Sequence, residues 1–391
     1  MKQLEELRTQ ILNTLDLTRD IEDHEILCRI DELILSESKT TPLTVLEKDR
    51  LRRELYASLR KLDVLQELLD DNEVTEIMVN GYQTIFVERK GTIQKYERQF
   101  SSPEKLDDVI QQIVGRCNRI VNEQIPIADA RLETGARVNA VLKPIALNGP
   151  ILSIRRFPDK PITMEALIQS KSITREAAEF LSHLVISGYS IMIGGGTSSG
   201  KTTFLNALSY YIPTRERIIT IEDNAELQLQ RAENLVRLES RAAVMDGTCE
   251  ISMDDLIKTA LRMRPDRIIV GEIRGREATS YITSLNLGHK GSMATAHANS
   301  AREMLSRLEM MVLMGMDLPL TAIRRQIASG VEILVHLDRD KNGHRRVEEI
   351  AEILGLEQEE VQLHTLYELQ EERLVPKSPL LHRAKLERAG L

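Results

Sequence analysis

The chain has 391 residues, of which 42% are hydrophobic, so we expect two or three domains with substantial cores rather than one domain. Its formal charge is -8 and only 3% of its residues are aromatic, which argues against a general nucleic-acid-binding surface or a base-stacking platform. Cys28, Cys117 and Cys249 are far apart and show neither metal-ligand nor disulfide spacing. This pattern is typical of a protein in a reducing cytoplasm.

The apolar segments are too short to cross a membrane, because a transmembrane helix needs roughly 20 consecutive apolar residues. The first six residues, MKQLEE, also lack the apolar region of a signal peptide. We therefore expect a cytoplasmic protein that reaches a membrane only through a partner or an exposed surface.

Residues 1–70 show only helical patterns and predict a small N-terminal helical bundle. Apolar residues recur at helical spacing from Leu4 to Leu15, and again over residues 26–34. The pattern breaks over residues 36–44, after which Thr44 and Glu47 form a capping-box signature. The alternative is a helical arm that has no core of its own.

Residues 71–157 change to a mixed pattern that predicts a compact α/β domain. A helix is expected over residues 106–121, and strands are expected over residues 74–79, 84–89, 137–142 and 151–156. Two prolines near residue 160 suggest a linker over residues 158–172.

Residues 173–391 alternate between strand and helix patterns, which is typical of a parallel sheet covered by helices on both faces. The final stretch, residues 358–391, is polar, and we expect it to form weak helix that frays. The strands of this domain are expected over residues 190–193, 217–221, 235–238, 267–270, 292–295 and 331–337.

A glycine-rich segment after the first of these strands fits the phosphate-loop pattern G-x-x-x-x-G-K-[ST]. Its glycines allow backbone N–H groups to face phosphate oxygens, and the following helix adds its positive end. Lys201 is expected on the β- and γ-phosphates of ATP, and the Thr202 hydroxyl on Mg²⁺. A chance glycine-rich turn is the alternative. The predicted nucleotide-binding residues are Gly195, Gly196, Thr197, Ser198, Ser199, Gly200, Lys201, Thr202 and Thr203.

Hydrolysis also needs carboxylates, and two apolar strands end in them. The strand over residues 267–270 leads to Glu272, which is expected to orient water or hold Mg²⁺; Gly271 stands where such strands usually carry Asp. The strand over residues 217–221 leads to Glu222 and Asp223, which are expected to assist, with Glu222 also a candidate metal ligand. Alternatively, Glu272 is a surface residue and the acid pair caps the next helix.

Histidines and arginines supply the remaining candidates. The polar alternation of Thr295, His297 and Asn299 at a strand end suggests a sensor of the γ-phosphate, although an isolated histidine is more often a packing residue. Arginines at positions 131, 137 and 155 lie in the preceding domain, from which cations can close over phosphates. The alternatives are a solvated basic face or salt bridges.

Together these motifs resemble the secretion ATPase superfamily of type II and type IV secretion, pilus and archaellum motors. The closest resemblance is to the CpaF family, the ATPase of tight-adherence (Flp) pili. The phosphate loop is followed, in the family's order, by an Asp box at residues 220–227, a Walker B strand at residues 264–274 and a His box that ends at residues 297–300. Further segments similar to the sequences of that family lie at residues 74–81, 129–132, 261–267 and 311–319.

The resemblance implies a RecA-like P-loop NTPase domain preceded by a smaller α/β, PAS-like domain and a helical bundle, assembled as a hexamer. It implies ATP and Mg²⁺ as cofactors and polytopic inner-membrane platform proteins as partners. The roles that it implies are catalysis for Glu272, the Asp box for Glu222 and Asp223, the His box for His289 and His297, and phosphate sensing for Arg131, Arg137 and Arg155.

Three functions remain open at this point. The first is a motor that drives assembly or retraction of a pilus or a related secretion system. The second is a hexameric nucleic-acid translocase on a similar core, against which the acidity and low aromatic content argue. The third is a nucleotide-gated scaffold with little turnover, against which Lys201 and Glu272 argue.

Overall fold

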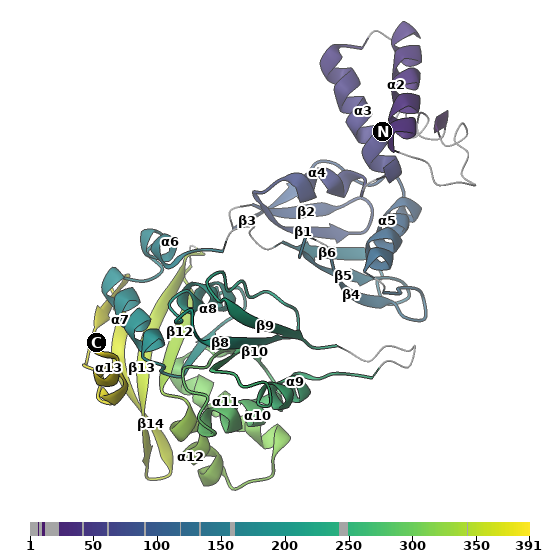
Figure 1. The fold of residues 1–391 in the computed structure, drawn as a ribbon. Coiled ribbons are helices and arrows are strands. Elements are labelled where there is room, and N and C mark those ends of the chain that lie inside the picture. Colours follow the sequence, from purple (N-terminus) through teal and green to yellow (C-terminus); the bar gives the residue numbers. More distant parts are fainter. Residues whose placement is uncertain are drawn as a thin grey trace. The chain divides into compact units, whose positions relative to one another are not determined.

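The computed structural model divides into two compact units, Met1–Asp159 (unit 1) and Lys160–Leu391 (unit 2), which Figure 1 colours by sequence. Leu4 and Leu15 of the first predicted helix, and residues 158–160 of the predicted linker, lie outside the described residues. The structure describes residues 7, 10, 11, 23–40, 43–60, 62–89, 91–117, 119–132, 134–156, 161–241, 249–341 and 343–391.

Two helices, α2 (Asp23–Thr40) and α3 (Val45–Arg60), pack together in the N-terminal part of unit 1. The predicted capping box is confirmed, since Thr44 N–H donates to Glu47 Oε2 at 2.8 Å and Glu47 N–H donates to Thr44 Oγ1 at 3.3 Å. The break predicted from residue 36 is wrong, because α2 continues to Thr40. Serine, glutamate and lysine disfavour a helix far less than glycine or proline would.

The rest of unit 1 is a sheet with strand order β3-β2-β1-β6-β5-β4, and all its neighbouring strands are antiparallel. Helix α5 (Pro103–Arg116), capped by Ser102, packs its apolar side into the same core as the sheet. It ends five residues earlier than predicted. The other elements are α4 (Val64–Asp70), β1 (Val74–Asn80), β2 (Ile85–Arg89), β3 (Thr92–Tyr96), β4 (Ile127–Arg131), β5 (Arg137–Val141) and β6 (Ile151–Arg155).

In the described part of unit 2, nine strands form one sheet in the order β15-β14-β13-β12-β7-β11-β10-β8-β9. Neighbours from β12 to β9 are parallel, whereas β13, β14 and β15 add to the edge antiparallel. The strands are β7 (Ile191–Gly195), β8 (Arg217–Glu222), β9 (Asn234–Glu239), β10 (Arg267–Ile273), β11 (Met293–His297), β12 (Ile333–Arg339), β13 (Arg345–Glu357), β14 (Glu360–Gln370) and β15 (Arg373–Pro376).

Helices cover both faces of this sheet, so the central strands are buried on both sides, as parallel strands require. One core contains α6 (Met164–Gln169), α7 (Arg175–Ile186) and α8 (Lys201–Ser209), and α13 (Ala384–Ala389) lies on the same side against α7. The opposite core contains α9 (Met253–Ala260), α10 (Glu277–Asn286), α11 (Ala301–Gly315) and α12 (Leu320–Gly330). The α/β class and the six strands predicted for this domain are confirmed.

Two features of unit 2 differ from the sequence pattern. Helix α6 lies inside residues 158–172, and its Met164 is buried in the core. The helical prediction for residues 358–391 is wrong over residues 360–376, where β14 and β15 form, whereas α13 near the end of the stretch is helical. Val361, Leu366 and Leu374 are buried there, so pairing to the sheet overrides a weak helical periodicity.

Candidate nucleotide site

The phosphate loop runs from the buried end of β7 to the first turn of α8, at the carboxyl edge of the parallel strands. Ser198 (φ 60°) and Gly200 (φ 94°) both take left-handed conformations, which turn successive backbone N–H groups toward one side. A side chain at Gly195 would collide with the carbonyl oxygen of Leu337 on the neighbouring strand. The loop therefore has the backbone shape that a cradle for phosphate oxygens needs.

Lys201 is held inside this loop by the loop's own backbone. Its Nζ donates to the carbonyl oxygens of Gly195 at 3.0 Å and Gly196 at 2.8 Å, and lies 3.4 Å from His297 Nδ1. The residue is only 7% exposed. The ammonium group is therefore fixed beside the predicted phosphate position, and it also contacts the end of β11.

His297 joins Lys201 to Glu272. Its Nε2 lies 2.7 Å from Glu272 Oε1 on β10, and its Nδ1 faces Lys201. Burial, followed by the Lys201 charge, lowers the pKa of His297, so the ring is neutral near pH 7. A neutral ring that accepts from Lys201 at Nδ1 must donate from Nε2–H to Glu272. These contacts bring together three predicted residues, one from the start of α8 and two from the ends of β10 and β11.

Arg274 extends the same group toward Asp223. Its guanidinium contacts Asp223 Oδ2, and its Nε lies 3.8 Å from Glu272 Oε2. Ser240 Oγ donates to the other oxygen of Asp223 at 3.0 Å. Arg274 was not predicted as a site residue, although it directly follows β10 and stands two residues after Glu272, the spacing at which side chains of a strand share one side.

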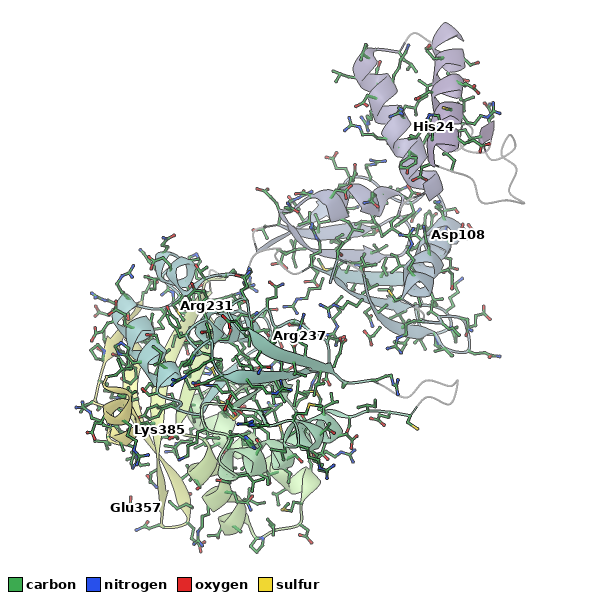
Figure 2. The ribbon with its side chains drawn as sticks, in the orientation of Figure 1. His24, Asp108, Arg231, Arg237, Glu357 and Lys385 are labelled. Atoms are coloured by element: carbon green, nitrogen blue, oxygen red, sulfur yellow. The ribbon has the colours of Figure 1, made fainter. Side chains whose placement is uncertain are left out.

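Glu222 is turned away from this group into the protein. Its Oε1 accepts backbone N–H bonds from Glu226 at 2.7 Å and Leu227 at 2.8 Å, and it is 2% exposed. Arg237, labelled in Figure 2, donates to the carbonyl oxygen of Leu227 at 3.1 Å. Burial raises the pKa of Glu222 to about 7. In this arrangement its carboxyl holds the loop after β8, although no helix begins there.

Gly271 explains how Glu222 fits. A Cβ atom at position 271 would lie 2.9 Å from Glu222 Cγ, so the aspartate usual at this position has no room. Thr295 Oγ1 donates to the Gly271 carbonyl oxygen at 2.6 Å and ties β11 to the same point. Glycine therefore replaces the usual aspartate at position 271 because the Glu222 side chain of the neighbouring strand occupies that space.

The structure does not bring His289 into the group. Its Nδ1 lies 3.1 Å from the Pro265 carbonyl oxygen, beside the start of β10, whereas His297 ends β11 at the opposite edge of the sheet. The five residues of β11 span on the order of 15 Å at about 3.3 Å each. The implied role of His289 stays a prediction.

Arg131, Arg137 and Arg155 belong to unit 1 and form a row across its sheet. Arg131 pairs with Arg137 between β4 and β5, and Arg137 pairs with Arg155 between β5 and β6. Directly opposed residues share one face of a sheet. The alternate residues on these strands, such as Val138 and Ile154, are buried, so the arginines lie on the face away from the core.

The beginning of β13 braces the phosphate loop. Arg345 Nε donates to the Ser198 carbonyl oxygen at 2.9 Å, and its Cδ would lie 3.2 Å from a Cβ at Gly200. Nothing near Arg345 in sequence predicted this contact, because 147 residues separate it from Ser198.

Comparison with known proteins decides the family. Residues 58–367 match the family described as type II/IV secretion system protein. The chain belongs to that family. It is 33% identical to the conjugal transfer protein TrbB of Rhizobium radiobacter over 327 residues, which cover 83% of this chain and 96% of the relative.

Two further matches agree with this assignment. The type IV secretion system protein PtlH homolog of Bordetella bronchiseptica is 32% identical over 315 residues, covering 74% of this chain and 93% of the relative. The crystal structure of the pilus retraction motor PilT with bound ADP matches with a TM-score of 0.53 and 16% identity, covering 85% of this chain and 87% of that one, and it supports the fold alone. Unit 2 is thus the RecA-like domain of a secretion ATPase, and ATP is its substrate.

Proposed function

We propose that this protein is a hexameric motor that couples ATP hydrolysis to movement between its two units and so powers assembly, or also retraction, of a tight-adherence or type IV pilus or a related secretion system. The observation that carries the proposal is the arginine row of unit 1. A phosphate loop and a triad of Lys201, His297 and Glu272 lie in one compact unit, and three aligned cations lie in the other.

In unit 2, each residue of the triad has a distinct task. Lys201 and the loop N–H groups bind the phosphates, and Glu272 orients the attacking water and takes its proton. His297 donates from Nε2–H to Glu272 Oε1 and so holds that carboxylate in one orientation. Because His297 is neutral, its contact adds no second positive charge beside Lys201.

The residues present fit a magnesium ion. The Thr202 hydroxyl follows directly after Lys201, and Glu272 offers a carboxylate that is 26% exposed, both being hard oxygen donors. The predicted ligand Glu222 fits less well, since its carboxyl is buried and accepts two backbone hydrogen bonds. Magnesium, when bound, would offset the negative charge that develops on the transferred phosphoryl group.

The arginine row provides the coupling. A charge-assisted hydrogen bond contributes roughly 1.5–3 kcal/mol, so two or three arginine–phosphate contacts supply the several kcal/mol that a shift between open and closed arrangements requires. Hydrolysis and phosphate release would remove those contacts and reopen the protomer. In a ring, Arg131, Arg137 and Arg155 would contact the phosphates when ATP is bound and lose those contacts after each hydrolysis.

The proposed setting is the cytoplasmic face of the inner membrane, with polytopic platform proteins as partners. Among the described residues, no helix has both the length and the apolar character to span a bilayer, so attachment would come through those partners. Neighbouring genes for prepilins and a platform protein would support a pilus motor. A neighbourhood of conjugation genes would instead favour the function for which TrbB is named.

The decisive experiment compares Arg131→Ala with Arg98→Ala in the purified full chain. Arg98 is also in unit 1 but is paired with Glu67 at 2.9 Å and lies outside the row. Arg131→Ala should keep nucleotide binding and lose at least about tenfold in turnover, since an arginine finger contributes 10³–10⁵-fold. Arg98→Ala should keep turnover. Normal turnover in Arg131→Ala would contradict the coupling.

Two further measurements separate the alternatives. Single-stranded or double-stranded DNA, or RNA, should leave the hydrolysis rate unchanged; stimulation would favour a nucleic-acid translocase. Glu272→Gln should lower hydrolysis by about 10²–10⁴-fold and abolish pilus output in cells. Pilus output that survives the loss of hydrolysis would favour a nucleotide-gated scaffold.

A further inference from the structure

Three potential metal ligands gather on the hairpin of β12 and β13: His336, Asp338 and Glu348. One ligand atom from each lies within 4.8 Å of the others. His336 and Asp338 are two residues apart on β12 and so project from the same face. His336 pairs with Glu349 and Leu337 with Val347, which leaves Glu348 as the extra residue of a β-bulge.

The bulge gives the cluster its shape. Bulges redirect side chains and locally end regular pairing. Here the bulge brings Glu348 Oε2 to 3.7 Å from His336 Nε2. That separation is too long for a hydrogen bond, whereas two donor atoms on one tetrahedral zinc ion lie roughly 3.3–3.5 Å apart. The spacing suits an ion between the two groups better than a direct contact.

The buried imidazole of His336 is a separate reason to expect an ion at this cluster. The residue is 2% exposed, and neither of its ring nitrogens has a hydrogen-bond partner among the described residues. Leaving a buried polar group without a partner costs about 1–3 kcal/mol, so such groups normally have one. A metal ion held with Glu348 would supply a partner for Nε2, the ring nitrogen that faces Glu348.

The charges around the cluster also suit a cation. Burial lowers the pKa of His336, which keeps the ring in the neutral form that binds metals. Burial, and then the charge of Asp338, raise the pKa of Glu348, so the nearby Asp338 carboxylate disfavours the ionised form of Glu348. A divalent cation between them removes that repulsion.

We propose that His336, Asp338 and Glu348 bind one divalent transition-metal ion of the zinc class, through one imidazole nitrogen and two carboxylates, with water completing its coordination. Nitrogen and oxygen donors in this combination are typical zinc ligands. The site lies on the hairpin whose Arg345 donates to Ser198, so the bound ion would stiffen the strand pair that braces the phosphate loop.

The test uses the full chain without nucleotide or Mg²⁺. Zn²⁺ is titrated by calorimetry, and Co²⁺ is titrated by its visible absorption, which reports its coordination geometry. We compare the parent with His336→Gln and Glu348→Gln. The matched control is His344→Gln, since His344 lies on the same hairpin but pairs with Asp340 at 3.3 Å.

The parent and His344→Gln should bind one Zn²⁺ with equal affinity and show the same Co²⁺ spectrum. His336→Gln and Glu348→Gln should bind more than about 100-fold more weakly, since even outer-shell changes cost 10–100-fold. Zinc should also raise the melting temperature of the parent but not of Glu348→Gln.

Unchanged affinity in Glu348→Gln would overturn the proposal, and so would loss of binding in His344→Gln. Glu348 is partly exposed, so its variant should fold even if His336→Gln does not. The melting temperature in the presence of a chelator checks this. Tight binding of Mg²⁺ in place of Zn²⁺ would overturn the assignment to the zinc class.

Discussion

The carboxyl ends of β8 and β10 lie side by side in one sheet, and each carries a glutamate. Glu222, which ends β8, is 2% exposed and binds two backbone N–H groups, whereas the Glu272 side chain on β10 is 26% exposed and contacts His297. Both strands are apolar and both residues are glutamates. The difference comes from neighbours: Gly271 leaves room for Glu222 to fold down over β10, and His297 holds Glu272 at the site.

A carboxylate at a strand end is therefore not by itself a catalytic group. Its protonation and exposure decide what it can do. A carboxyl with a pKa near 7 is half neutral at physiological pH and serves poorly as a metal ligand. Substitutions at the two glutamates and at the neighbours that set them apart therefore have different expected effects.

The largest effect is expected for Glu272→Gln. The amide cannot take a proton from water, and general-base groups contribute about 10²–10⁴-fold to rate. Turnover should fall by that factor while nucleotide affinity stays within a few-fold, as measured by steady-state hydrolysis and by binding of a fluorescent nucleotide. Equal losses in Glu222→Gln would show that the two glutamates share the chemistry.

Glu222→Gln should change the pH dependence of stability. The folded-state pKa of Glu222 is raised from 4.5 to about 7, so its contribution is fully present below pH 4.5 and is lost as the pH rises through 7. Each pKa unit corresponds to about 1.4 kcal/mol, so the parent should lose roughly 3 kcal/mol relative to the variant across that range. Urea unfolding of both proteins at pH 5 and pH 8 measures this difference; a difference that does not change with pH would contradict the buried position.

His297→Gln should lower turnover by about 10–100-fold, because misplacing a catalytic group by 1 Å can cost 10²-fold. The pKa of His297 is lowered, so in the parent the ring should remain neutral, and turnover constant, as the pH falls through 6.5. A pH–rate profile of parent and variant tests both statements. A parent profile that already declines at pH 7 would show that the ring is charged there.

The smallest effect is expected for Gly271→Ala. The added methyl would lie 2.9 Å from Glu222 Cγ, and overpacking of this kind typically costs about 1–3 kcal/mol. The double variant Gly271→Ala with Glu222→Ala should recover part of that loss, which urea unfolding of the four proteins of the cycle would reveal. Purely additive losses would mean that the two positions do not share space.

Much of the site could be predicted from the sequence because its parts are local. The phosphate loop is contiguous, and its glycines, Lys201 and Thr202 have fixed spacing, so strand, loop and helix could be assigned together. Glu272 and Glu222 could be placed at strand ends because buried strands read as unbroken apolar runs. The two edge strands after residue 358 were missed, because their stability comes from pairing with β13 rather than from their own pattern.

Sequence alone thus determined that a phosphate loop follows a central strand and that acidic and histidine motifs come after it in order. Only the tertiary structure decided that His297 links Lys201 to Glu272, that Glu222 turns inward over Gly271, and that three arginines align in one row. The physical reason is the distance along the chain between the residues that interact. Turn conformations and apolar runs depend on adjacent residues, whereas register, side-chain direction and burial depend on strands that meet from distant parts of the chain.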